Sequence, residues 1–170
     1  MTAKPMNRRS FIRTSAVAGA ATIAAPNIVR GHNLNSRLNI AMIGLGNRGQ
    51  RNTGYFAAEN IVALCEVDQL KLNLVSKFQP KARREADFRK LFDHEKEFDA
   101  VVVSTPEHSH AFATLPALQL GKHVYCEKPL TYNIEEARVI RMAARNSNVV
   151  TQMGIPVSYT HLTLPTILLV

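Results

Sequence analysis

Three glycines with the spacing G-x-G-x-x-G stand in the segment Gly44–Gly49, which reads GLGNRG. The first glycine permits a tight turn, the second lets phosphate approach the backbone, and the third lets a helix pack on a strand. The apolar run 38–43 precedes the motif, and a helical stretch follows it. Because free N–H groups at a helix N-terminus bind anions, we expect this turn to bind the phosphates of a dinucleotide. The residues that we assign to it are Gly44, Gly46, Asn47, Arg48 and Gly49.

An acidic residue follows the glycines at the distance that such a site requires. Glu66 ends the apolar run 61–66, about 20 residues beyond the motif, where a carboxylate binds the hydroxyls of the adenosine ribose. Asp68 is the alternative ligand, and a solvated carboxylate at a strand end is the alternative interpretation of Glu66. A carboxylate there disfavours the 2′-phosphate of NADP, so we expect NAD. Arg48 keeps NADP possible, because a guanidinium pairs with phosphate.

A lysine is the candidate for proton transfer. Lys128 follows the apolar run in 122–129, which reads KHVYCEKP, and so stands at the carboxyl end of an expected strand. A lysine whose pKa is lowered by partial burial acts in acid–base catalysis. The alternative is a surface lysine whose stem covers apolar residues.

The histidines and cysteines do not form a metal-binding pattern. The pair His108 and His110 has the spacing H-x-H without further ligands nearby, so we predict no metal. His110 either shapes the cofactor pocket or begins a helix. Cys65 and Cys126 each close an apolar strand, which indicates two buried thiols and not a disulfide.

The elements that carry these residues alternate between strand and helix. We expect strands at 38–43, 61–66, 99–106 and 122–129, with another opening near 149. Helices are expected from Asp68 to about 78, over 108–120 before Gly121, and over 133–147, while 80–98 reads as loop plus a short helix. Such alternation predicts an α/β fold with a doubly wound parallel sheet, which binds ligands at the carboxyl ends of its strands.

The first 26 residues have the anatomy of an export signal. Arg8 and Arg9 are followed by Ser10, Phe11 and Ile12 and then by an uncharged, Ala-rich stretch, which resembles a twin-arginine signal. We therefore expect export, to the periplasm or beyond, through the twin-arginine machinery. Residues 27–36 read as a linker before the domain at 37–155.

The positive charge belongs largely to this leader. The chain has a net charge of +8, and residues 1–30 carry five basic and no acidic side chains. The remainder has 16 basic and 13 acidic residues, which is an ordinary solvated surface without the basic stripe of a nucleic-acid-binding protein. No run of 20 apolar residues is present, so we expect no membrane span.

Several motifs together resemble the Gfo/Idh/MocA oxidoreductases. They are GLGNRG, ALCEVD, STPEHSHA, GKHVYCEKPL and TQMG, within residues 37–154. The resemblance implies a Rossmann domain followed by a second α/β domain, and oxidation or reduction of sugar or polyol hydroxyls with NAD(P). It also implies that Ser104, Thr105 and Pro106 line the nicotinamide side and that Lys128 contacts the reacting hydroxyl. Glu127 and Pro129 complete its lysine motif.

Two other functions remain open on the same fold. An NAD-dependent glycosidase oxidises its sugar only transiently, and a non-catalytic protein binds the dinucleotide as a sensor. The export signal argues against a gene regulator, and Lys128 argues against a role without catalysis. We expect the full-length protein to form a homo-oligomer.

The last residues depart from that family. The letters VSYTHLTLPT, which begin at Val157, match the translation of a transposon-end adapter used in sequencing libraries. The adapter continues into a variable index and a stop codon, which accounts for the chain up to Val170. We therefore expect residues 156–170 to be artefactual, the Rossmann domain to be truncated near residue 155, and the second domain to be missing. Such a fragment is expected to be inactive.

Overall fold

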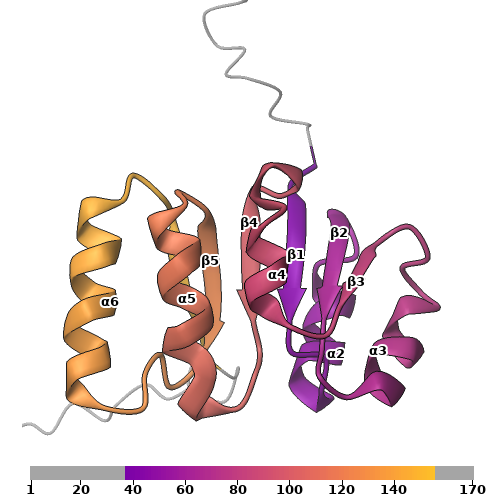
Figure 1. Ribbon diagram of the computed structural model, residues 1–170, viewed down its shortest axis with the longest axis horizontal. Coiled ribbons are helices and arrows are strands. Elements are labelled where there is room, and N and C mark those ends of the chain that lie inside the picture. Colours follow the sequence, from indigo (N-terminus) through magenta and orange to yellow (C-terminus); the bar gives the residue numbers. More distant parts are fainter. Residues whose placement is uncertain (1–36, 156–170) are drawn as a thin grey trace, which may run out of the picture. The chain divides into compact units, whose positions relative to one another are not determined.

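Parallel strands form the centre of the structure. This computed structural model describes residues 37–155, which contain a sheet of six strands in the order β3-β2-β1-β4-β5-β6 (Figure 1). The strands are β1 (Asn39–Ile43), β2 (Asn60–Cys65), β3 (Arg83–Glu85), β4 (Ala100–Val103), β5 (His123–Glu127) and β6 (Thr151–Gly154). The expected leader (1–26), linker (27–36) and tail (156–170) lie outside the described residues.

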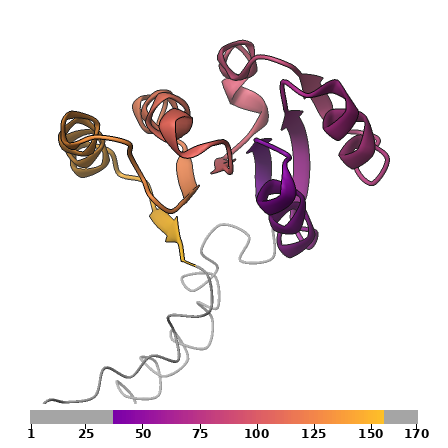
Figure 2. The same cartoon turned by 90° about the horizontal axis from the view of Figure 1, so that it is seen from below.

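Helices cover both faces of this sheet. They are α2 (Asn47–Tyr55), α3 (Gln69–Ser76), α4 (Phe88–Phe92), α5 (His110–Gln119) and α6 (Ile134–Asn146), with short 3₁₀ helices η1 (Glu95–Glu97) and η2 (Glu107–Ser109). Seen from below, α5 and the orange α6 lie on one side and the indigo α2 on the other (Figure 2). The doubly wound parallel α/β fold expected from the sequence is confirmed.

Alternation along the strands divides the core into two layers. In β1, Ala41 and Ile43 face the cluster that contains Leu91 of α4 and Ala113 of α5. The intervening residues of β1 face a second cluster, which contains Leu72 of α3. Because successive side chains of a strand point to opposite faces, the unbroken apolar runs of the inner strands are those of a sheet buried on both sides.

The strand order reverses direction between β1 and β4. β1 pairs in parallel with β2 on one side and with β4 on the other. The connections from β1 and from β4 therefore leave in opposite directions along the sheet. In parallel sheets the crevice at such a switch point is the usual ligand site.

Side-chain caps fix where two of the helices begin. Asp68 accepts a hydrogen bond from the amide of Leu70 at 2.9 Å and so caps α3. Asn133 accepts one from the amide of Glu136 at 2.8 Å and caps α6. Asn and Asp are favoured at this position because they satisfy an amide that the helix leaves without a partner. Gly121, with φ of +68°, stands just past the end of α5.

One strand was missed by the sequence analysis. β3 lies within 80–98, where a loop and a short helix were expected, and α4 and η1 follow it. Its letters, RRE, are charged and partly exposed. It is an edge strand that pairs only with β2 among the described strands, so its residues show no apolar pattern that would predict it.

The two cysteines are buried and free, as expected. Burial raises the pKa of the Cys65 thiol to about 12 and that of Cys126 to about 11. The strands that carry them, β2 and β5, are separated by β1 and β4. Between residues 37 and 155, no helix has the length and apolar character that a bilayer crossing requires.

Candidate functional site

The turn after β1 is shaped by glycines that approach other backbone closely. Gly44 has φ of +86°, and a Cβ there would lie 2.6 Å from the amide nitrogen of Thr105. A Cβ at Gly49 would lie 1.9 Å from the carbonyl oxygen of Gly44. The first glycine thus lets the β1 turn contact the β4 loop, and the third lets α2 begin against that turn, as the motif predicts.

Gly46 differs, because a Cβ there would meet no protein atom within 4 Å. It is the N-cap residue of α2, and no side chain caps this end of the helix. The first turn of α2 also carries no acidic residue. The amides of this turn therefore face open space at the positive end of a helix dipole, which is an arrangement that binds phosphate.

A cavity of about 530 Å³ lies beside this turn, at the carboxyl ends of β1, β2 and β4. Many of the residues assigned from the sequence line it. They are Gly44, Gly46, Asn47, Arg48, Glu66, Asp68, Ser104, Thr105 and Pro106. The glycine turn, the acid after β2 and the loop after β4 are thus brought together around one hollow at the switch point of the sheet.

Glu66 is held by backbone amides on either side of its carboxylate. Its Oε2 accepts a hydrogen bond from the amide of Leu45 at 2.7 Å, and its Oε1 accepts one from the amide of Asp68 at 3.0 Å. Each carboxylate oxygen has a second lone pair for a hydroxyl donor. Glu66 is only partly buried and lines the cavity.

Asp68 is committed to its own helix. One oxygen caps α3, and the other lies 3.2 Å from the ammonium of Lys71. The hydrogen bond with Lys71 and those from the α3 amides lower the pKa of Asp68 below its usual value. Of the two acids considered for the ribose, Glu66 is the one that accepts a hydrogen bond from the glycine turn, through the amide of Leu45.

The carboxylate of Glu127, at the end of β5, is buried and does not line the cavity. It accepts hydrogen bonds from Arg48 Nε at 2.7 Å and from Asn52 Nδ2 at 2.9 Å. The hydrogen bond to Glu127 raises the pKa of Arg48. Arg48 was the residue whose guanidinium could pair with the 2′-phosphate of NADP, and in the structure it is paired with the Glu127 carboxylate.

Asn52 was not identified from the sequence. Its amide is 1% exposed, and besides Glu127 it donates to Ser104 Oγ at 2.8 Å. The only signal was a polar residue one turn after the glycine motif, on the face of α2 that packs inward. Its two partners lie far away in the sequence, so this signal did not reveal its role.

Lys128 and Pro129 are exposed at the carboxyl edge of β5. The amide of Lys128 donates to the carbonyl of Gly154 at 3.1 Å, which fixes the start of this loop against the end of β6. The lysine side chain is thus carried on the same edge of the sheet as the glycine turn.

His110 connects this loop to the one after β4. It is the first residue of α5 and is 1% exposed, so it lies beneath the surface. Its Nδ1 lies 2.6 Å from the carbonyl oxygen of Pro129, and its Nε2 lies 2.8 Å from that of Thr105. Within residues 37–155 no cluster of three or more potential metal ligands is found.

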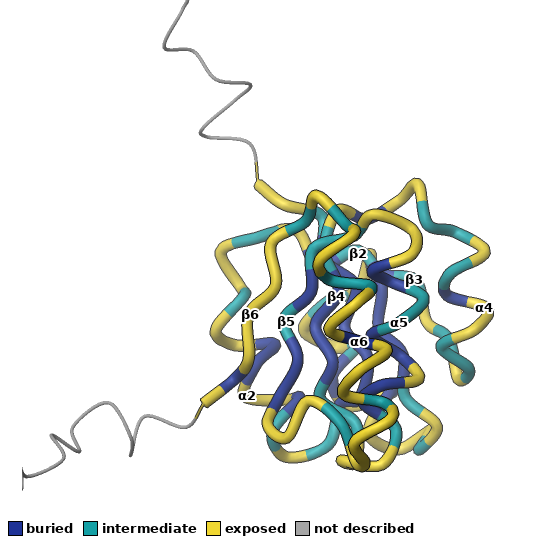
Figure 3. The backbone as a smooth tube through the Cα atoms, turned by 90° about the vertical axis from the view of Figure 1, so that its left-hand side faces the viewer, coloured by how far each residue is buried: buried dark blue, intermediate teal, exposed yellow. Residues whose placement is uncertain are grey.

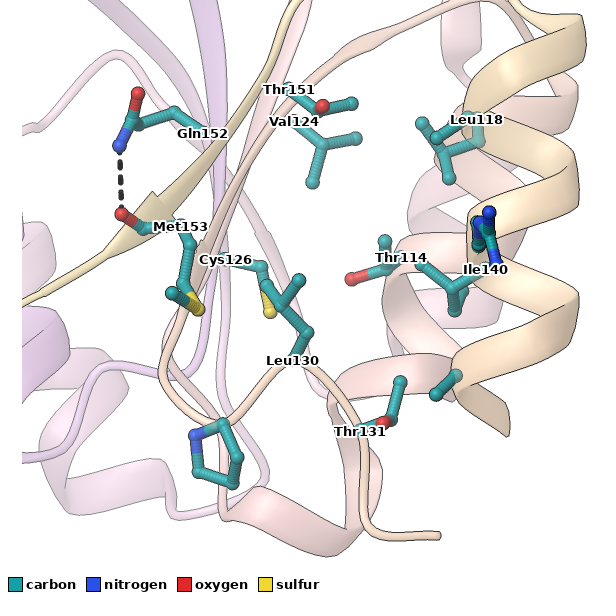
Figure 4. A pocket seen from close by; sticks show the side chains of 14 residues that line it. Thr114, Leu118, Val124, Cys126, Leu130, Thr131, Ile140, Thr151, Gln152 and Met153 are labelled. Carbon is teal, nitrogen blue, oxygen red and sulfur yellow. Dashed lines mark hydrogen bonds between the residues drawn. The ribbon is translucent and has the colours of Figure 1, made fainter. Parts of the chain in front are cut away.

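A second cavity, of about 540 Å³, lies between the strand pair β5–β6 and helix α6 (Figure 4). Apolar and small side chains such as Val124, Cys126, Leu130 and Met153 line much of it. Of the residues assigned to the site, only Pro129 contributes to its wall. It is bounded by β6, whose first three residues are exposed (Figure 3).

Comparison with known proteins supports both parts of the sequence interpretation. Residues 38–155 match the family model of the Gfo/Idh/MocA oxidoreductases, described as an oxidoreductase family with an NAD-binding Rossmann fold. Residues 5–25 match the model of the twin-arginine translocation signal sequence, which indicates export by that pathway.

Several relatives act on sugars or cyclic polyols, by their names. The chain is 52% identical over 52 residues to 1,5-anhydro-D-fructose reductase of Ensifer adhaerens, covering 31% of this chain and 16% of that protein. It is 27% identical over 124 residues to levoglucosan dehydrogenase of Pseudarthrobacter phenanthrenivorans, covering 66% and 32%. It is 28% identical over 127 residues to scyllo-inositol 2-dehydrogenase (NAD⁺) of Bacillus subtilis, covering 67% and 34%. The chain thus spans about a third or less of the length of these relatives.

Solved structures agree with the fold. Apo scyllo-inositol dehydrogenase from Lactobacillus casei superposes with a TM-score of 0.65 at 27% identity, over 70% of this chain and 36% of that one. Levoglucosan dehydrogenase in complex with NADH and L-sorbose superposes with a TM-score of 0.62 at 25% identity, over 69% of this chain and 34% of that one. With the glycine turn and Glu66 around one cavity, these likenesses establish that the chain belongs to the Gfo/Idh/MocA family of oxidoreductases, with an NAD-binding Rossmann fold.

Proposed function

We propose that residues 37–155 bind NAD and that the whole protein transfers a hydride between its nicotinamide and a hydroxyl-bearing carbon of a sugar or polyol. The observation that carries the proposal is the open, uncapped N-terminus of α2 at Gly46, beside the cavity that Glu66 lines. The named substrates of the relatives support the substrate class. A second domain beyond β6 is part of this proposal, because those relatives are about three times as long as the segment that matches them.

Each part of the site has a distinct task in this proposal. The amides at the start of α2 bind the pyrophosphate, next to Gly44, Gly46, Asn47, Arg48 and Gly49. Glu66 accepts hydrogen bonds from the ribose hydroxyls. The loop of Ser104, Thr105 and Pro106 borders the nicotinamide, while His110, Glu127 and Pro129 hold the surrounding loops. Bound NAD supplies the hydride acceptor or donor.

Lys128 exchanges a proton with the reacting hydroxyl in this proposal. It stands on a loop at the carboxyl edge of the sheet, and its side chain is exposed to an incoming substrate. When the alcohol is oxidised, the hydroxyl proton leaves to a base as the hydride leaves from carbon. General acid–base catalysis of this kind contributes about 10²–10⁴-fold, so Lys128→Ala in the longer native protein should lower turnover by that order. Unchanged turnover would remove Lys128 from the mechanism.

A matched pair of glycine variants tests NAD binding in the 170-residue chain. Gly46→Ala places a methyl group where no protein atom lies within 4 Å, so it should leave the fold intact. The methyl group would occupy the space of the pyrophosphate and weaken NAD binding by about tenfold or more. Gly54→Ala is the control, because Gly54 lies in the same helix and its Cβ also meets nothing.

The measurement is a calorimetric titration with NAD, with circular dichroism to confirm folding. We expect the unsubstituted chain and Gly54→Ala to bind alike and Gly46→Ala to bind much more weakly. Equal binding by all three chains would mean that phosphate does not lie at α2. No binding by any of them would refute the claim that residues 37–155 suffice for NAD.

We also propose the division of the chain into an export signal at 1–26, a linker at 27–36, the Rossmann domain at 37–155 and an artefactual tail at 156–170. The twin-arginine match over residues 5–25 and the oxidoreductase match over 38–155 support the first three parts. Long-read sequencing of the source DNA tests whether residues 156–170 are artefactual. A stop codon after Val170 in genomic DNA would show that the tail is genuine.

A further inference from the structure

The ring of His110 lies between two carbonyl groups. Its Nδ1 is 2.6 Å from the oxygen of Pro129 and its Nε2 is 2.8 Å from the oxygen of Thr105. Pro129 belongs to the loop after β5, and Thr105 belongs to the loop after β4. The side chain is 1% exposed, so water does not compete for either contact.

Both partners of the ring can only accept hydrogen bonds. A neutral imidazole carries one N–H, and its other nitrogen presents a lone pair. In a neutral His110, this lone pair would point at a carbonyl oxygen across a hydrogen-bond distance, in a buried site. An imidazolium ion donates from both nitrogens and so satisfies both carbonyl groups.

Two effects oppose a charge at this place, and the two contacts favour it. Burial disfavours an ion, and the N-terminus of α5 disfavours a cation. Hydrogen bonds from a charged donor are, however, shorter and about twice as strong as neutral ones, and both distances are short. The ring joins the segments 104–109 and 127–133, whose charged or titratable side chains are Glu107, His108, Glu127, Lys128 and Tyr132. Of these, the Glu127 carboxylate is already occupied by Arg48 and Asn52.

We propose that His110 is a positioning residue, and that as an imidazolium ion it donates to the carbonyls of Thr105 and Pro129 at once. The ring then sets the separation between the loop assigned to the nicotinamide and the loop that carries Lys128. This inference rests on the proposed function for the roles of the two loops. The charge of His110 does not depend on the roles of the loops, so this inference and the proposed function can fail separately.

Nuclear magnetic resonance of the ring nitrogens tests the charge directly. The 170-residue chain, labelled with ring-¹⁵N histidine, is measured near neutral pH by long-range ¹H–¹⁵N correlation. His110 is assigned by the signal that disappears in His110→Gln. We expect two protonated nitrogens with similar shifts. One protonated and one unprotonated nitrogen, with widely separated shifts, would overturn the proposal.

Two variants test the positioning role, because each keeps one donor of the ring. In His110→Asn the amide nitrogen replaces Nδ1 and reaches only Pro129, while in His110→Gln it replaces Nε2 and reaches only Thr105. Amide hydrogen exchange should therefore rise severalfold near Thr105 in the first variant and near Lys128 in the second. His94→Gln is the control, because His94 is a partly exposed histidine that does not line the cavity.

The outcomes separate the two proposals. Exchange that rises equally in both loops, or in neither, contradicts the positioning role even if the chain binds NAD. A doubly protonated ring with loop-specific exchange supports it even if the chain does not bind NAD. If either variant fails to fold, the other one still assigns the His110 signal by its disappearance, and the nitrogen shifts of the unsubstituted chain then decide the charge.

Discussion

Asn52 donates hydrogen bonds to Ser104 Oγ at 2.8 Å and to Glu127 Oε1 at 2.9 Å through the two hydrogens of one amide nitrogen. A single buried side chain of α2 thus joins the helix of the glycine motif to the ends of β4 and β5. The glycine turn and the loops on the other side of the cavity are therefore held together by polar contacts as well as by the sheet.

Removal of this amide should destabilise the domain. Asn52→Ala removes one side-chain donor from the buried Glu127 and deprives Ser104 Oγ of the amide that donates to it. A buried group left without a hydrogen bond costs about 1–3 kcal/mol, and we expect a loss of that size in the free energy of unfolding by urea. Asn146→Ala, at an exposed position in α6, is the control. Equal stability of the two variants would show that the network contributes nothing.

Gly154→Ala should disturb the same network from β6. The new Cβ would lie 2.6 Å from the hydroxyl of Tyr125 and 2.7 Å from Glu127 Oε2. Overpacking of this kind costs about 1–3 kcal/mol, and displacement of the carboxylate would weaken its contact with Arg48. Urea unfolding measures the loss. Gly54→Ala serves again as control, and a Gly154→Ala domain as stable as that control would contradict the predicted clash.

Glu66 should determine the preference for NAD. We expect Glu66→Ser to weaken NAD binding by about 1.5–3 kcal/mol, the range for hydrogen bonds to a charged group. The substitution should also reduce the preference for NAD over NADP, because the carboxylate that repels a 2′-phosphate is removed. Calorimetric titration with both cofactors measures the change, with Glu135→Gln on α6 as control. If the ratio of the affinities for NAD and NADP is unaltered, Glu66 does not determine the cofactor preference.

The buried thiols should make stability fall in alkali. Because burial raises the pKa of Cys126 to about 11, above the usual value of 9.0, the folded chain keeps a proton that the unfolded chain loses. This stability is fully present below pH 9 and is lost as pH rises towards 11, by up to about 1.4 kcal/mol per pH unit for one proton. Between pH 8 and 11, the free energy of unfolding should therefore fall less steeply with pH for Cys126→Ala than for the unsubstituted chain. If the free energy of unfolding falls equally with pH in both chains, the raised pKa of Cys126 is contradicted.

Export should depend on the arginine pair. Changing both Arg8 and Arg9 to Lys should hold the chain in the cytoplasm, since the match to the translocation signal spans residues 5–25. Cell fractionation followed by immunoblotting measures the distribution. Arg13→Lys, in the same leader, keeps the pair and should be exported normally. Normal export of the double variant would contradict the assignment.

The features predicted correctly from the sequence are those that neighbouring residues determine. The apolar runs of β1, β2, β4 and β5 and the spacing of the glycines are local patterns, so one chain sufficed to find them. β3 was missed because three charged residues at a sheet edge obey no such pattern. The contacts of Asn52 were missed because Ser104 and Glu127 are 52 and 75 residues away, and only the folded topology brings them together.

The strand order also has a consequence for the time at which the cavity forms. β1 meets β2 early in synthesis, but its other neighbour, β4, aligns Ala100 with Ile40 and emerges much later. Closing that longer loop costs more chain entropy, and domains fold as the ribosome releases them. We expect a nascent chain that ends after β3 to carry the glycine turn and Glu66 but no opposing wall. The dinucleotide would then be captured only after β4 has joined the sheet.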